Sequence, residues 1–267
     1  MIETDFARLS PTISPDGVLE LVLDEAGKLN AIDGALHRML ANVWRDVDAD
    51  PRVRAVLLRA EGKAFSAGGD LDWVEELASD FEARARGFRE ARELVHNLVN
   101  CAKPTVSAIN GVAVGAGLAI ALLTDISIAG KSAKILDGHT RIGVAAGDHA
   151  VMAWPILCGL ARARYHLLLC DRIDGPTAAE IGLVSLCVED DALLPKAREI
   201  AGRLATGSAT AIRWTKHSLN HWLRMAGPAF EASLAAEFLG FSGPDAREGI
   251  AAVREKRAPN FTGPADD

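Results

Sequence analysis

Two glycine-rich turns constrain this sequence most, because each stands between a strand-like run and a helix-like run. The first reads KAFSAGGDL over residues 63–71, and the second reads NGVAVGAGL over residues 110–118. Apolar strand-like runs at 55–59 and 105–109 precede them. A strand that ends in small residues and opens a helix leaves backbone N–H groups free at its tip. Two such tips side by side can bind one developing oxyanion, such as a polarised carbonyl oxygen.

This pair of turns closely resembles the signature of the crotonase superfamily, the enoyl-CoA hydratases and isomerases. Three further segments match it in order and spacing: KLNA at 28–31, DGPTAAEIGLV at 174–184 and EKRAPNF at 255–261. The resemblance implies an α/β fold with a crotonase-like ββα spiral core over residues 1–192. It also implies a helical C-terminal region over 193–267 that makes trimer contacts, giving a homotrimer or a dimer of trimers.

The family resemblance assigns roles to individual positions in these segments. It implies that the backbone N–H groups of Gly69 and Ala116 form an oxyanion hole for an acyl-CoA thioester. Coenzyme A would then be part of the substrate, with no separate cofactor. The positions implied to contact coenzyme A or the acyl group are Lys28, Leu29, Ala64, Ala67, Gly68, Gly115 and, from a neighbouring subunit, Lys256.

The sequence departs from the family pattern at the acid–base positions. Hydratases of this family carry two glutamates that hold a water molecule and protonate the α-carbon of the substrate. The matching positions here are Ala119 and His139. Because alanine has no proton to transfer, the two-carboxylate hydration mechanism is not available in its usual form. The resemblance therefore points to a subgroup with a His–Asp pair in place of the two glutamates.

Asp148, nine residues after His139, is the candidate partner of that histidine. A histidine whose second nitrogen is held by a carboxylate is an effective general base near neutral pH. Asp148 also stands where a helix beginning at residue 150 would want an N-cap, so a purely structural role remains an alternative. His139 has its own alternative, a hydrogen-bonded histidine of the core or rim.

Three functions remain open from these residues. The first is enoyl-CoA hydratase or isomerase activity on an acyl-CoA thioester, a lyase-like reaction. The second is retro-Claisen cleavage of a β-dicarbonyl compound, because crotonase relatives with that activity carry a similar His–Asp pair and a histidine near position 37. The third is acyl-CoA binding without turnover. The acyl group itself leaves no interpretable signal in the sequence.

The composition of the chain limits the classes of partner and the cellular compartment that we expect for it. The formal net charge of −7 argues against nucleic acid or an anionic membrane as a main partner. No apolar leader occurs in the first ten residues, and the longest apolar stretch, 112–123, is short for a membrane span. Four scattered cysteines without a C-x-x-C pair fit a reducing, cytoplasmic compartment. His217 and His221 stand one helical turn apart, but without a third ligand they predict no metal site.

Periodicity predicts the elements around these motifs. Strands are expected at 18–23, 126–129, 134–136 and 183–188, and a long, charge-rich helix at 82–100. Asp70 is expected to cap a helix that begins at Leu71. Further helices are expected at 112–123, 154–170, 193–205, 209–225, 229–239 and 244–256. His96, His149 and His166 receive no role.

Overall fold

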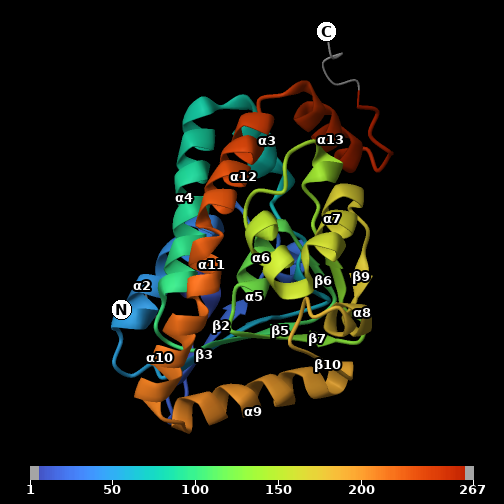
Figure 1. Cartoon of the computed structure of the whole chain (residues 1–267). Coiled ribbons are helices and arrows are strands. Elements are labelled where there is room, and N and C mark those ends of the chain that lie inside the picture. The colour runs from blue at the N-terminus through green and yellow to red at the C-terminus, as the bar shows by residue number, and fades with distance from the viewer. Residues whose placement is uncertain (1–5, 262–267) are drawn as a thin grey trace.

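The computed structural model describes residues 6–261 of the 267-residue chain (Figure 1). Expectations for residues 1–5 and 262–267, which include the outer ends of the expected core and of the expected C-terminal region, lie outside the described residues.

Two sheets form the centre of the fold. The six-stranded sheet has the order β1-β2-β3-β5-β7-β10 and the four-stranded sheet the order β4-β6-β8-β9. The first comprises β1 (Thr12–Ile13), β2 (Val18–Leu23), β3 (Ala55–Ala60), β5 (Thr105–Ile109), β7 (Ile126–Gly130) and β10 (Leu186–Val188). The second comprises β4 (Ala64–Ser66), β6 (Val112–Val114), β8 (Lys134–Leu136) and β9 (Ile173–Asp174).

The chain alternates between these sheets in a regular way. β3, β5 and β7 each lie in the large sheet, and the strand that follows each of them lies in the small sheet. Helices return the chain after β4 and β6, so successive units stack as a ββα spiral. β5 is buried along its whole length, as expected of a parallel strand covered on both faces.

Helices cover the sheets on both sides. Before β9 they are α2 (Gly34–Ala49), α3 (Leu71–Ser79), α4 (Phe81–Asn100), α5 (Gly115–Leu122), α6 (Ala150–Cys158) and α7 (Leu160–Leu169). After it come α8 (Gly175–Glu180), α9 (Leu193–Thr206), α10 (Ala209–Leu219), α11 (His221–Met225), α12 (Gly227–Gly240) and α13 (Pro244–Arg254). Short 3₁₀ turns are η1 (Ala7–Leu9), η2 (Ala26–Lys28), η3 (Thr140–Ile142) and η4 (Asp190–Ala192).

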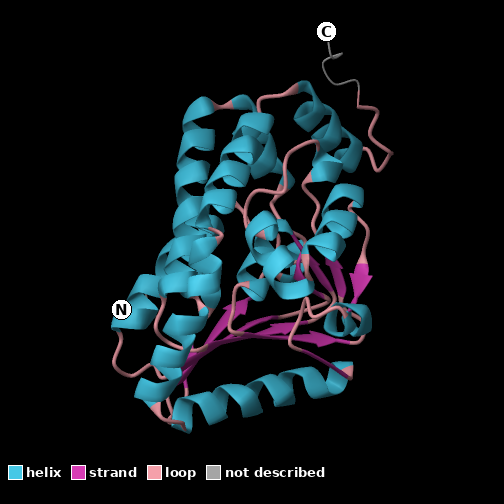
Figure 2. Cartoon of the chain, in the orientation of Figure 1, coloured by secondary structure: helices cyan, strands magenta, loops and turns pink. Residues whose placement is uncertain are grey.

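α9 lies alone across the lower face of the large sheet in the view of Figure 2. Its buried residues recur every three or four positions, which makes one apolar stripe that packs on β3, β5 and β7: Leu193, Ala197, Ile200, Ala201 and Ala205. The remaining helices gather on the other side, where α12 packs on α4 and α6, and α13 on α3 and η3. The helices after residue 193 therefore help to build the walls of the site described below, and the division at that residue stays a prediction.

Most predicted elements are confirmed, and the errors have local causes. Asp70 caps α3 as predicted, accepting a hydrogen bond from the Asp72 amide at 3.0 Å. The single helix over 154–170 is wrong, because Gly159 at a φ of +83° separates α6 from α7. The helix over 209–225 is interrupted at Asn220, between α10 and α11.

The remaining differences concern strand limits. The predicted helix at 112–123 begins only at Gly115, since its first three residues form β6. The predicted strand at 183–188 is reduced to β10. Within the described part of the chain, no helix is both long and apolar enough to cross a membrane.

Candidate active site

The two glycine-rich turns lie side by side because the strands that lead into them are paired. β4 and β6 run parallel, so both turns leave the same edge of the small sheet. A Cβ on Gly68, which has a φ of +91°, would lie 3.3 Å from the carbonyl oxygen of Val114. A Cβ on Gly117 would lie 2.2 Å from the Cβ of Ser66. Glycine at both positions therefore allows α5 to pack directly on the turn after β4.

The first turn leaves one amide available. The Gly68 N–H donates to Ser66 Oγ at 3.1 Å. The Asp70 N–H donates to the carbonyl oxygen of Ile32 at 2.9 Å. Between them, the N–H of Gly69 has no hydrogen-bond partner within residues 6–261. A Cβ on Gly69 would lie 2.9 Å from a methyl group of Val74, so glycine also allows the Val74 side chain to pack closely on this turn.

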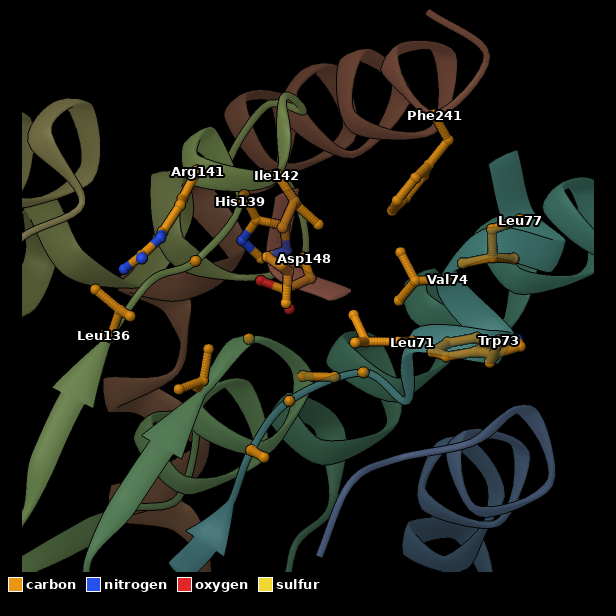
Figure 3. A pocket seen from close by; sticks show the side chains of 18 of the residues that line it. Leu71, Trp73, Val74, Leu77, Leu136, His139, Arg141, Ile142, Asp148 and Phe241 are labelled. Atoms are coloured by element: carbon orange, nitrogen blue, oxygen red, sulfur yellow. Dashed lines mark ion pairs between the residues drawn. The ribbon is translucent and has the colours of Figure 1, made fainter. Parts of the chain in front are cut away.

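Gly69 and Ala116 line the same cavity, which has a volume of about 650 Å³. Ala116 is the second residue of α5, and an N–H in the first turn of a helix has no partner within that helix. Apolar side chains from α3, α12 and the turn after α12 form one wall of the cavity (Figure 3): Leu71, Val74, Leu77, Phe238 and Phe241. The volume is that of a small-molecule site.

Four buried ionisable side chains, of which the last three line the cavity, stand on its polar side, and we call them the His139 cluster: Asp137, His139, Asp148 and Glu237. They come from the chain between β8 and η3, from the residues before α6, and from α12. His139 Nδ1 lies 3.1 Å from both carboxylate oxygens of Asp137. Its Nε2 lies 3.6 Å from Asp148 Oδ2 and 3.4 Å from Glu237 Oε1. The imidazole thus stands between three carboxyl groups, and Figure 3 shows it beside Asp148 at the centre of the cavity.

Burial and charge act in opposite directions on these groups. Burial alone lowers the pKa of His139, but the three facing carboxyl groups outweigh it and hold that pKa well above its ordinary value. Burial raises the pKa of Asp148, yet the charge of His139 and the hydrogen bond with His149 pull it below its ordinary value. Burial raises the pKa of Glu237 to about 7, although the charge of His139 opposes this. At neutral pH the cluster therefore holds His139 as an imidazolium, with Glu237 able to exchange a proton.

A second histidine reaches the cavity from α2. His37 is buried, and its ring centroid lies 4.8 Å from that of Trp73. Its Nδ1 lies 3.4 Å from Glu90 Oε2, and Arg38 Nε donates to the other oxygen of Glu90 at 2.8 Å. Burial raises the pKa of Glu90, but these two partners outweigh it and hold the pKa below its usual range. His37 thus faces the cavity with an ionised carboxylate behind it.

Comparison with known proteins identifies this architecture. The enoyl-CoA hydratase/isomerase family model matches residues 14–264 of the chain. A probable enoyl-CoA hydratase from Rhodobacter capsulatus is 34% identical over 252 residues, which cover 93% of this chain and 95% of that protein. The chain belongs to the enoyl-CoA hydratase/isomerase family.

Solved structures of the family carry the same fold. An enoyl-CoA hydratase/isomerase from Mycobacterium paratuberculosis superimposes with a TM-score of 0.86 at 31% identity, covering 91% of this chain and 98% of that one. A β-diketone hydrolase from Anabaena sp. PCC 7120, solved with (S)-3-oxocyclohexyl acetic acid, superimposes with a TM-score of 0.82 at 26% identity, covering 90% and 96%. The α/β spiral with a helical C-terminal region, expected from the resemblance, is confirmed.

The positions expected to contact coenzyme A fall in different places. Four of these positions line the cavity of about 650 Å³: Ala67, Gly68, Gly115 and Lys256. Lys256 follows the end of α13 in the same chain. Ala64 is buried in β4, and Leu29 is 47% exposed beside the first turn. Lys28 lines a separate, smaller cavity of about 460 Å³. Their roles toward coenzyme A stay predictions.

The two acid–base positions of the family separate clearly in space. His139 lines the cavity, whereas Ala119 is buried in α5 and is not among the lining residues. The alternative role of Asp148 as a helix cap is wrong, because His149 occupies the N-cap of α6 and no side chain caps it. Asp148 instead faces His139 Nε2, the nitrogen on the far side of the ring from Asp137.

Sequence reasoning missed two members of the cluster. Asp137 stands two residues before His139, and its position directly after a strand was the only available signal. Glu237 lies on α12, which also carries Glu231, and nothing in the sequence of that helix marks Glu237 as the one that is buried. Asp137 is near His139 because only one residue separates them, whereas Glu237 reaches His139 because α12 packs on α6.

The cluster also bears on metal binding. One ligating atom each from Asp137, Asp148 and His149 lies within 4.8 Å of the others. Each of these groups already has a side-chain partner, since Asp137 contacts His139 and Asp148 contacts His149. His217 and His221 stack edge to face at 5.1 Å on the far helices. The expectation of no metal remains a prediction.

Proposed function

We propose that this protein is an acyl-CoA enzyme that stabilises a thioester enolate or oxyanion with the amides of Gly69 and Ala116. The observation that carries the proposal is the unpartnered Gly69 N–H in a cavity that it shares with the first turn of α5. Preorganised backbone donors of this kind contribute about 2.7–4 kcal/mol each to transition-state stabilisation. Coenzyme A would enter as part of the substrate, along the turn at Lys28 and Leu29 and past Lys256.

In this proposal the His139 cluster moves the proton. A C–H bond next to the thioester breaks as its electrons enter the enolate, whose oxygen is held by the two amides. The proton passes to Glu237 when that carboxyl is ionised, and the His139 imidazolium supplies one to a different carbon. The net result is a shift of the double bond. Hydration requires in addition a water molecule held by the same carboxyl groups.

A second candidate is retro-Claisen cleavage of a β-dicarbonyl compound. It is favoured by the His139 cluster itself, which places a histidine among carboxyl groups where hydratases of the family carry glutamate. The cluster, in its deprotonated form, would take a proton from a water molecule, and the oxygen of that water molecule would attack one carbonyl carbon of the substrate. The C–C bond then breaks, and its electron pair enters an enolate at the other carbonyl group. The amides hold this enolate until the cluster returns the proton to its carbon.

The deciding experiment compares three reactions on the purified protein: hydration of crotonyl-CoA, isomerisation of a 3-enoyl-CoA, and cleavage of a cyclic β-diketone. Each is measured for wild type, Ala116→Pro and Ala116→Ser. Proline removes the N–H at a helical position that tolerates it, whereas serine keeps the N–H. We expect Ala116→Pro to lower kcat about 10²–10³-fold and Ala116→Ser to stay near wild type.

The outcome separates the candidates. Turnover of the thioesters alone supports the acyl-CoA enzyme, and turnover of the β-diketone alone supports the hydrolase. Tight binding of acyl-CoA thioesters by calorimetry, with no turnover of any substrate, would favour the third possibility, a non-catalytic binding protein. Equal losses in both Ala116 variants would contradict the oxyanion hole.

The assembly proposed is a homotrimer or a dimer of trimers. Large apolar side chains on α7, α10 and α11 are more than 60% exposed in the single chain: Leu168, Trp214, Trp222 and Met225. Exposed apolar groups of this size are typical of protein interfaces. Light scattering after gel filtration tests this, and a monomer at micromolar concentration would contradict it.

A further inference from the structure

The start of α6 departs from the usual pattern of a helix N-terminus. His149 occupies the N-cap with a φ of −163° and a ψ of −27°, and no side chain accepts a hydrogen bond from the first turn. Asp148, of a residue type that caps helices well, is directed elsewhere. An absent cap lowers the stability of a helix. Local rules are most often broken in this way where a side chain is needed for another purpose.

The side chains involved form a buried chain of contacts. The indole Nε1–H of Trp154 donates to His149 Nε2 at 3.2 Å. The opposite nitrogen, His149 Nδ1, lies 2.6 Å from Asp148 Oδ1. The second oxygen of the same carboxylate faces His139 Nε2 at 3.6 Å. Trp154 and His149 are fully buried, and Asp148 is nearly so.

The direction of these hydrogen bonds determines the tautomer of His149. An indole N–H can only donate, so His149 Nε2 must accept and carry no proton. The ring then has its proton on Nδ1, where it donates to Asp148. An imidazolium would present a second N–H to the indole N–H and lose that bond. Trp154 therefore favours the neutral form with a protonated Nδ1.

We propose that Trp154 and His149 are positioning residues that hold Asp148 toward His139. One oxygen of Asp148 is bound by a fixed donor, and the other is left to face the imidazole of His139. The proposal builds on the proton-transfer role given above to the His139 cluster. His149 itself does not line the cavity, so its effect passes through Asp148.

The surroundings of Asp148 explain why it needs a fixed donor. His139 and His149 face it closely, and the Glu237 carboxyl approaches the same nitrogen of His139. Without His149, the carboxylate could rotate to pair with His139 through either oxygen. Asp148 and Glu237 would then compete for one imidazole nitrogen in variable geometry, and misplacement of about 1 Å can cost 10²-fold in rate.

The first test is independent of any substrate. Nitrogen-15 NMR of the intact wild-type protein reports which ring nitrogen of His149 is protonated. We expect the neutral ring to carry its proton on Nδ1, with Nε2 unprotonated. A neutral ring protonated on Nε2 would overturn the proposal whatever reaction the protein catalyses.

The second test uses a matched pair of variants. His149→Asn keeps an N–H close to the position of Nδ1, whereas His149→Leu removes it. With the substrate that wild type turns over, we expect His149→Leu to lower kcat about 10–100-fold. We expect the kcat of His149→Asn to stay within about threefold of the wild-type value. The kcat of Trp154→Phe should lie between those of the two His149 variants, because this change removes only the hydrogen bond that fixes the tautomer of His149.

Stability is measured in parallel to separate positioning from packing. A purely structural role predicts that rate follows the folded fraction and that the pH profile of kcat/KM stays unchanged. A positioning role predicts a change in the pH profile of His149→Leu. The limb of that profile that reports the ionisation of His139 should move to lower pH, because a displaced Asp148 no longer stabilises the imidazolium of His139. If both His149 variants lose equal activity with unmoved pH profiles, the inference is wrong.

Discussion

Two groups of charges in this protein, one around the buried ammonium of Lys216 and one around His139, are built on opposite principles. In the Lys216 cluster, comprising Lys216, Asp125 and Thr105, the ammonium of Lys216 lies 2.8 Å from Asp125 Oδ2. That oxygen also accepts from the Thr105 amide at 2.7 Å and its hydroxyl at 2.9 Å. Every charge there has a close, complementary partner.

The His139 cluster is unbalanced by comparison. Three carboxyl groups share one imidazole at 3.1–3.6 Å. Glu237 Oε2 is buried without a hydrogen-bond partner in the described part of the chain. A balanced cluster stabilises one arrangement, whereas an unbalanced one shifts pKa values and leaves a group able to exchange protons. Burial alone thus does not distinguish a structural ion pair from a catalytic one, but the matching of partners does.

The largest expected effect is on rate, in His139→Gln. Removal of the imidazole should lower kcat about 10²–10⁴-fold, the usual contribution of a positioned acid–base group. His96→Gln is the control, because His96 pairs with Glu231 at 2.9 Å outside the cavity and should stay within about twofold. Steady-state kinetics provide the measurement, with whichever substrate the wild-type protein turns over in the three-reaction comparison. Unchanged turnover in His139→Gln would place the chemistry elsewhere.

The next effect concerns stability and should appear only in the balanced cluster. Lys216→Met leaves Asp125 without its counterion, and we expect the free energy of unfolding to fall by about 2–3 kcal/mol. Activity per folded molecule should not change. Lys196→Met is the matched control, since Lys196 makes an exposed pair with Glu199 and should cost less than about 1 kcal/mol. Urea denaturation measures both, and equal losses would contradict the distinction.

The smallest effect is a pH-dependent gain in stability in Glu237→Gln. Because burial raises the pKa of Glu237 to about 7, the folded protein holds this proton more tightly than the unfolded chain. Wild type therefore loses stability as pH rises from the unfolded pKa toward the folded one. Glutamine does not ionise, so the variant should gain about 1–2 kcal/mol relative to wild type between pH 5 and about pH 6.5.

Glu231→Gln on the same helix is the control for that prediction. Glu231 is hydrogen-bonded to Arg92, and this bond, which outweighs its partial burial, lowers the pKa of its carboxyl group. Replacement of Glu231 by glutamine should leave the free energy of unfolding at pH 8 unchanged or slightly lower. A relative gain in Glu231→Gln, or none in Glu237→Gln, would show that the imbalance of the His139 cluster is compensated in the folded protein.

Features that depend on neighbouring residues could be predicted from the sequence. The two turns, the Asp70 cap and the long helix α4 follow from local hydrogen bonding, glycine conformation and apolar periodicity. The resemblance carried by those turns also identified His139 and Asp148 as neighbours in one site. One local feature was nevertheless missed. The helix predicted over 154–170 is divided at Gly159, because that glycine has a positive φ that apolar periodicity does not encode.

Only the tertiary structure determined which charged groups surround His139. Glu237 belongs to a distant helix, and nothing in its own segment distinguishes it from a surface glutamate until α12 packs over α6. Asp137 and the Trp154–His149 contact likewise depend on side-chain directions set by packing. Local sequence determines which elements form and where amides are left free, whereas pKa values arise from burial and from charges that long-range folding brings together.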